Sequence, residues 1–124
     1  MTDDGCIRAA IEAIVERLVA DYAPQKIILF GSYAHGQPDE DSDIDLLIIK
    51  DTAERFVDRM TTVRRLTRGT HDSIPFDPLV YTPAEIEHGR RTGDQFLAEI
   101  LEKGEVLYVE ASFQAVSALI DKLR

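Results

Sequence analysis

The sequence has one cysteine, no tryptophan, few basic residues and no long hydrophobic run. Cys6 stands alone among 124 residues, which excludes an internal disulfide or a zinc site built from cysteines and favours a reducing, cytoplasmic location. The longest apolar runs, Ile27–Phe30 and Leu46–Ile49, are far shorter than the ~18 residues that a membrane span needs. Lys and Arg number 14 against 23 Asp and Glu, a formal net charge of −9, which opposes unassisted binding to nucleic acid or to anionic membranes.

The rest of the composition predicts one globular domain. Hydrophobic residues make up 44% of the chain and charged residues 30%, which is ordinary for a folded protein. The start, Met1–Asp4, is acidic and lacks the basic segment of a signal peptide. Linkers, repeats and low-complexity tracts are missing, so we expect a single domain over residues 1–124.

Hydrophobic periodicity and turn residues predict the element order α-β-β-α-β-α-α-β-α. Thr82 and Glu85 have capping-box spacing with Pro83 between them, and Pro78 predicts that its strand lies at a sheet edge or is bulged. The order predicts an α/β (α+β) fold with a small mixed sheet flanked by helices. The expected elements are helix 5–20, strand Lys26–Phe30, strand Asp43–Ile49, helix Asp51–Arg68, strand Ile74–Tyr81, a helix from Thr82, helix Asp94–Lys103, strand Glu105–Val109 and a helix capped by Ser112.

Two carboxylates begin the second predicted strand. Asp43 and Asp45 are separated by Ile44, so alternation places both on one face of the strand while Ile44 points into the core. Two like charges there oppose folding, because Asp is depleted in strands and repulsion at such spacing costs ~0.7–3 kcal/mol. A hard divalent cation would remove that cost. The preceding acids, Asp39, Glu40 and Asp41, are better explained as a solvated loop.

Gly31-Ser32 directly follows the first predicted strand. A glycine there lets the backbone turn close to a ligand, and the amides that follow can bind phosphate.

The motif Gly31-Ser32, ten residues, then Asp43-Ile44-Asp45-Leu46 resembles the signature of the DNA polymerase β-like nucleotidyltransferase superfamily, in its minimal single-domain (MNT) branch. The resemblance extends from the first helix to about Val109. It implies the polymerase β-like fold, with Gly31 and Ser32 contacting the phosphates of a nucleoside triphosphate. It also implies that Asp43 and Asp45 bind two Mg²⁺ ions and that a third carboxylate on a later strand completes the site.

Asp77 is the candidate for the third carboxylate, because it interrupts an apolar strand where a charge has no packing role. A gatekeeper charge on an edge strand is the alternative explanation, and Asp72 and Glu85 are weaker candidates. This sequence also departs from the family pattern at two positions. Related proteins often have Arg directly after the Gly-Ser pair and again two residues later, whereas this chain has Tyr33 and His35. His35 is either a loop residue or a phosphate contact.

The helix expected after the Asp strand carries five arginines, at Arg55, Arg59, Arg64, Arg65 and Arg68. A solvated helix face is the default interpretation, and a surface that docks an acidic partner or RNA is the alternative.

The resemblance implies transfer of a nucleoside monophosphate, AMP from ATP, to a hydroxyl group. Members of the MNT branch are typically encoded beside a HEPN-domain ribonuclease toxin, act as its antitoxin and can modify a toxin tyrosine. We therefore expect a HEPN partner, no direct contact with nucleic acid or membrane, and possible oligomers. Two alternatives stay open: adenylylation of a small molecule such as an aminoglycoside, and a non-catalytic module that blocks its partner by contact alone.

Overall fold

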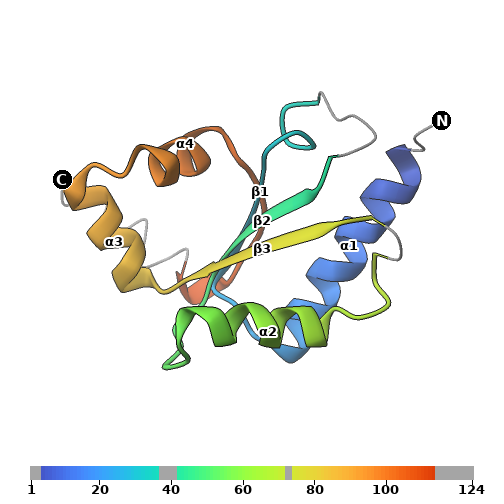
Figure 1. Cartoon of the computed structure of the whole chain (residues 1–124), viewed down its shortest axis with the longest axis horizontal. Coiled ribbons are helices and arrows are strands. Elements are labelled where there is room, and N and C mark those ends of the chain that lie inside the picture. Colours follow the sequence, from blue (N-terminus) through green and yellow to red (C-terminus); the bar gives the residue numbers. More distant parts are fainter. Residues whose placement is uncertain (1–3, 37–41, 72–73, 114–124) are drawn as a thin grey trace.

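Four helices surround a four-stranded mixed sheet in the computed structural model, which describes residues 4–36, 42–71 and 74–113 (Figure 1). The strands lie in the order β3-β2-β1-β4. Only β2 and β3 are parallel to each other, while β1 is antiparallel to both β2 and β4. The predicted fold class is confirmed, as is the element order as far as β4. The elements are α1 (Asp4–Asp21), β1 (Lys26–Phe30), β2 (Ile44–Ile49), α2 (Phe56–Leu66), β3 (Phe76–Tyr81), α3 (Pro83–Thr92), α4 (Gln95–Lys103) and β4 (Glu105–Val109).

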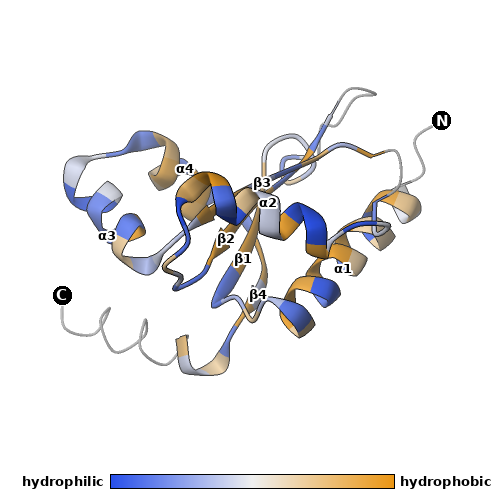
Figure 2. Ribbon diagram, turned by 60° about the horizontal axis from the view of Figure 1, so that its bottom comes forward, coloured by the Kyte–Doolittle hydropathy of each residue, from blue (hydrophilic) through white to orange (hydrophobic). Residues whose placement is uncertain are grey.

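The larger core lies on the face of the sheet that α1 and α2 cover. Ile14 and Leu18 of α1 are fully buried there with Leu29 of β1 and Leu46 of β2. Burial of side chains of this size stabilises a fold by ~1.5–3 kcal/mol each. Figure 2 shows mostly hydrophobic strands in the middle of the molecule and helices in which hydrophobic and hydrophilic residues alternate.

A smaller core lies on the opposite face, under α3 and α4. Ile28 and Leu47 pack there against Leu97 and Ile100 of α4. Because side chains alternate along a strand, β1 and β2 contribute apolar residues to both faces. This explains why their sequences are nearly continuous in hydrophobic residues, a pattern typical of strands that are covered on both sides.

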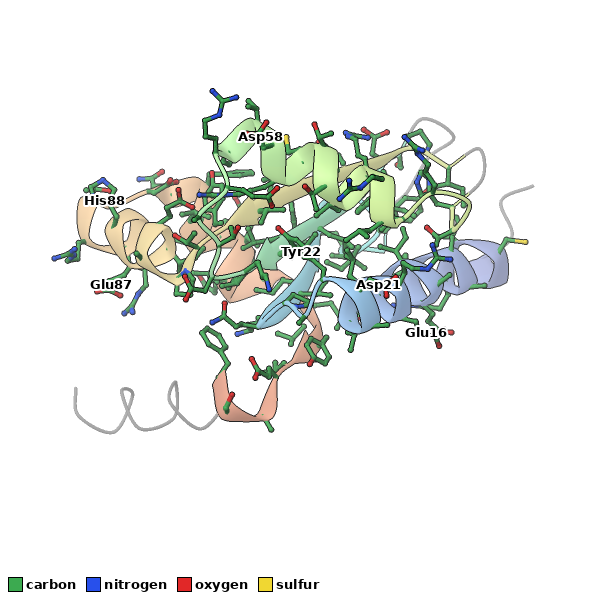
Figure 3. The ribbon with its side chains drawn as sticks, turned by 90° about the horizontal axis from the view of Figure 1, so that it is seen from below. Glu16, Asp21, Tyr22, Asp58, Glu87 and His88 are labelled. Carbon is green, nitrogen blue, oxygen red and sulfur yellow. The ribbon has the colours of Figure 1, made fainter. Side chains whose placement is uncertain are left out.

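Charged side chains lie mainly on the outer surfaces. Figure 3 shows Glu16, Asp21, Asp58, Glu87 and His88 on the outside of the helices, with Tyr22 in the interior. No helix within the described ranges is long and apolar enough to cross a membrane.

Several predicted boundaries were wrong. Helix α2 begins at Phe56 rather than Asp51: Arg55 has extended backbone angles (φ −66°, ψ 154°), and the amide of Glu54 donates to the Thr52 hydroxyl at 3.1 Å. The side chain of Thr52 thus forms a local turn instead of a helix cap. The same helix ends at Leu66 instead of Arg68. Strand β2 begins at Ile44 instead of Asp43, and β3 begins at Phe76 instead of Ile74.

The other boundary signals agree with the structure. Pro78 lies on an edge strand, as predicted, and Thr82 and Glu85 form the expected capping box. Asp94 and Gly104 flank α4. Most of the helix expected after Ser112 lies outside the described residues.

Arg59 does not belong to a solvated helix face, which corrects the default interpretation for one of the five arginines. Its side chain is only 8% exposed. It donates to the carbonyls of Glu54 and Val80 at 2.9 and 3.2 Å and to the Glu85 carboxylate at 2.7 Å. Arg59 therefore connects α2 to β3 and to the start of α3, and it holds the edge strand in place.

We expect Glu85→Ala to destabilise the protein by roughly 2–3 kcal/mol, because it removes half of a capping box and the anionic partner of a buried guanidinium. Burial alone would raise the pKa of Glu85, but hydrogen bonds from Arg59 and Thr82 hold that pKa below its ordinary value of 4.5. The stability that Glu85 contributes is thus present above pH 4.5 and is lost as the pH falls through the lowered value.

Denaturant unfolding of Glu85→Ala at neutral and acidic pH measures both effects. Glu87→Ala on the same helix is the matched control, since Glu87 pairs with Arg90 in the solvent-exposed region and such pairs contribute under ~1 kcal/mol. Equal losses in the two variants would contradict the role given to Glu85.

Candidate active site

Two of the three predicted carboxylates lie side by side on neighbouring strands. Asp45 of β2 and Asp77 of β3 are register partners in the parallel pair. Asp43 directly precedes β2 and is exposed, while Ile44 between the two acids is fully buried. The predicted alternation is therefore confirmed, and all three acids lie at the end of the sheet where β2 and β3 begin.

The end of β1 completes this part of the sheet. Phe30, its last residue, pairs with Asp45 in the antiparallel register, so Gly31 lies beside that carboxylate. Gly31 has a φ of +76°, and a Cβ atom at this position would collide with Oδ2 of Asp45. The positive φ favours glycine there, and a side chain at this position would displace the Asp45 carboxylate. Ser32 follows and is exposed.

Asp45 has an unusually high pKa for an aspartate. Its pKa is raised from 3.8 to about 6, first by partial burial and then by the negative charges of Asp77 and Asp43. Desolvation and like charges both disfavour the ionised form. Unless a cation lies between them, the three carboxylates therefore repel one another.

Arg64 is a neighbour of the site whose position the sequence did not predict. Its Nη1 donates to the carbonyl of Phe76 at 3.1 Å, and its Nη2 lies 4.0 Å from Oδ1 of Asp77. The sequence indicated Arg64 only as one of five arginines on the same helix. The contact depends on α2 running alongside the edge strand, which no local pattern in the sequence reveals.

The remaining candidates lie elsewhere or have structural partners. The carboxylate of Glu85 accepts hydrogen bonds from Arg59 and from the backbone amide of Thr82 in the α3 cap, so Glu85 is not the third carboxylate. Asp72, Asp39, Glu40 and Asp41 lie outside the described residues. The hydroxyl of Tyr33 donates to the carbonyl of Ser42 at 3.3 Å, which connects the residues after Gly31 to the start of β2. His35 is exposed in the turn after Gly31.

The donor atoms at this end of the sheet suit a hard divalent cation. Carboxylate oxygens are the ligands that Mg²⁺ prefers, and a cation would relieve the repulsion that raises the pKa of Asp45. As placed, however, no three His, Cys, Asp or Glu side chains among the described residues form a group that could hold a metal ion. The chemistry of the donors fits a metal, while the arrangement brings only Asp45 and Asp77 into register.

We expect Asp45→Asn to stabilise the metal-free protein at pH 7.5, because it removes the central charge at nearly constant size. The gain should be roughly 1–2 kcal/mol, since solvent screens a partly exposed group. In wild type the folded-state pKa of Asp45 is raised, so the contribution of Asp45 to stability is most favourable at low pH and falls as the pH rises from 3.8 to about 6.

The advantage of the Asn variant should therefore disappear near pH 4, as measured by urea unfolding at both pH values. An advantage of the same size at pH 4 and pH 7.5 would show that charge repulsion is not its cause.

Comparison with known proteins places this geometry in a family. The model of the family described as "Polymerase beta, Nucleotidyltransferase" matches residues 12–112. The chain is 36% identical over 101 residues to "Putative protein adenylyltransferase MJ0604" of Methanocaldococcus jannaschii, a match that covers 80% of this chain and 95% of that relative.

Two solved structures are also similar. One is a "putative nucleotidyltransferase" from Sulfolobus solfataricus, with 26% identity, coverage of 70% of this chain and 82% of that one, and a TM-score of 0.48. The other is a toxin–antitoxin with AMP-PNP, with 18% identity, coverage of 90% and 86%, and a TM-score of 0.53; at this identity the likeness concerns the fold alone.

The family model spans most of the chain, and the sheet it corresponds to carries the Gly31 and Asp45 arrangement described above. The expected family and the polymerase β-like fold are confirmed, and the chain belongs to the polymerase β nucleotidyltransferase family and is a nucleotidyltransferase.

Proposed function

We propose that this nucleotidyltransferase moves AMP from ATP, with Mg²⁺, to a hydroxyl group on a partner protein. The partner we propose is a HEPN-domain ribonuclease toxin modified on a tyrosine, for which the chain is the antitoxin. The observation that carries the catalytic part is the register of Asp45 with Asp77, directly beside a glycine whose backbone lies against the Asp45 carboxylate.

Each residue of the site has a separate task in this proposal. Gly31 lets the backbone approach the triphosphate, and Ser32 together with the amides after it binds the phosphate oxygens. Asp43, Asp45 and Asp77 would hold two Mg²⁺ ions, which supply positive charge to the acceptor hydroxyl and to the leaving pyrophosphate. Asp77, on the edge strand, lies on the side from which an acceptor can approach.

The reaction itself needs no covalent intermediate with the protein. The acceptor oxygen attacks the α-phosphorus, the bond to pyrophosphate breaks, and the products are the AMP-modified hydroxyl, pyrophosphate and a proton. The protein contributes orientation and fixed charge, as is usual in phosphate transfer. The exposed position of Asp77, whose side chain is 57% accessible, leaves the acceptor side open to a large molecule.

A protein acceptor is favoured by the relatives. The Methanocaldococcus jannaschii relative bears the name of a protein adenylyltransferase, and a protein of the same fold has been solved as a toxin–antitoxin with AMP-PNP. The described residues form one small sheet with four helices, which offers little surface for enclosing a second small substrate.

Mg²⁺ should stabilise wild type but not Asp45→Asn. With a dissociation constant of ~1 mM, 10 mM Mg²⁺ would contribute about 1.4 kcal/mol, or roughly 4–7 °C in melting temperature. Thermal unfolding of both proteins with and without Mg²⁺ measures this difference. If Mg²⁺ raises the two melting temperatures equally, the carboxylates do not bind it.

Label from α-labelled ATP should appear on the HEPN partner when the chain, Mg²⁺ and that partner are mixed, and mass spectrometry should place it on a tyrosine. Asp43→Ala should abolish the transfer. Asp77→Asn should still bind ATP–Mg²⁺ in calorimetry but lose ~10²–10³-fold in rate, the cost of one preorganised electrostatic contact.

Other outcomes would replace the proposed acceptor or the proposed activity. Label on an aminoglycoside, with every HEPN protein unlabelled, would make the chain a small-molecule adenylyltransferase. Neutralisation of the toxin by Asp43→Ala as well as by wild type, without label transfer, would make it a binding-only antitoxin.

A further inference from the structure

A cavity of about 280 Å³ lies beside the phosphate-binding glycine, between the end of β1 and helix α4. Phe30 and Gly31 line it from the strand, and Phe96 and Ile100 line it from the helix. His35 and Lys103 add polar groups to its lining. Because Gly31 lines this cavity and also lies beside Asp45, the cavity adjoins the proposed active site.

Phe96 is the feature of the cavity that the fold itself does not explain. Its side chain is 51% exposed, although it contacts the ring of Phe30 in an edge-to-face arrangement at 5.9 Å and 86°. Helix α4 is attached to the sheet by the buried Leu97 and Ile100 and is capped by Asp94. An aromatic ring that stays half exposed beside a mainly apolar cavity has a free surface for an apolar, planar group.

The order of the strands places the cavity and Asp77 on different sides of the site. Helix α4 packs over β1, β1 pairs with β2, and β2 pairs with β3. The cavity and Asp77 therefore lie on opposite sides of Gly31 and Asp45. If the acceptor approaches at Asp77, the cavity beside α4 is on the side left for the nucleotide.

The size and lining of the cavity restrict which part of a nucleotide fits. A volume of about 280 Å³ is slightly below the ~300–1,000 Å³ of typical ligand pockets, so a base with its sugar fits better than a whole nucleoside triphosphate. Lys103 is paired with Glu99 at 3.6 Å, and these two residues offer one donor and one acceptor to the polar edge of a base or to a sugar hydroxyl.

We propose that this cavity binds the nucleobase of the nucleoside triphosphate, stacked on Phe96 while the phosphates follow Gly31 and Ser32 toward the carboxylates. The inference rests on the proposed function, because it takes a nucleoside triphosphate as the ligand. Phe96 thereby becomes a nucleotide-binding residue that no sequence motif indicates.

The test compares two ligands that differ only in having a nucleoside. Phe96→Ala should weaken binding of ATP–Mg²⁺ in calorimetry about 5- to 150-fold, the range reported for base–aromatic stacking. Binding of inorganic tripolyphosphate with Mg²⁺, which has no base, should stay unchanged. Phe96→Trp should retain the affinity for ATP, because it keeps an aromatic face.

Phe56→Ala is the matched control. Phe56 is also partly exposed, at 39%, and contacts Tyr81 at 5.7 Å, but it lines a different cavity, beside α3. It should leave ATP affinity unchanged. Melting temperatures of all variants confirm that each is folded.

Three results are decisive. Wild-type affinity for ATP in Phe96→Ala would overturn the nucleobase site, and so would an equal loss for ATP and tripolyphosphate, which would mean that Phe96 only shapes the phosphate site. Failure of wild type itself to bind ATP or tripolyphosphate would instead contradict the proposed function, so the two failures are distinguishable.

Discussion

The pairing of β2 between β1 and β3 is the constraint on which the site depends. It places Asp45 opposite Phe30 on one side and opposite Asp77 on the other. The same pairing brings Gly31 so close to the Asp45 carboxylate that a Cβ at this position would displace the carboxylate. A shift of one residue in either register would turn the carboxylates toward the opposite face of the sheet, so the turn at Gly31 and the acids are positioned by one set of backbone hydrogen bonds.

This arrangement has a stability cost that the hydrophobic strands offset. Ile44, Leu46 and Ile48 are fully buried on the face under α1 and α2, and they hold β2 in place while Asp43 and Asp45 occupy the other face at its start. The raised pKa of Asp45 reflects the cost of holding a partly buried carboxylate beside Asp77 and Asp43. The site thus concentrates negative charge where a cation and a triphosphate would bind, which is consistent with a function based on charge and positioning.

The arginines of α2 divide into different roles once the fold is known. Arg59 is buried and connects α2 to β3 and α3, and Arg64 contacts the strand that carries Asp77. Arg55, in contrast, forms an exposed pair with Asp58. Helix α2 therefore stabilises the edge strand β3 and places the guanidinium group of Arg64 beside Asp77.

The sequence by itself determined the strands, the capping box at Thr82 and the spacing of Gly31, Asp43 and Asp45, because these features depend on local periodicity and on residues with special backbone or capping properties. It also selected Asp77, since a charge inside an apolar strand is visible locally. Tertiary structure alone decided that Asp77 pairs with Asp45, that Arg59 is buried, that Arg64 reaches Asp77 and that Phe96 contacts Phe30. Each of these contacts joins elements distant in the chain, and their packing is set by sheet order and helix placement rather than by neighbouring residues.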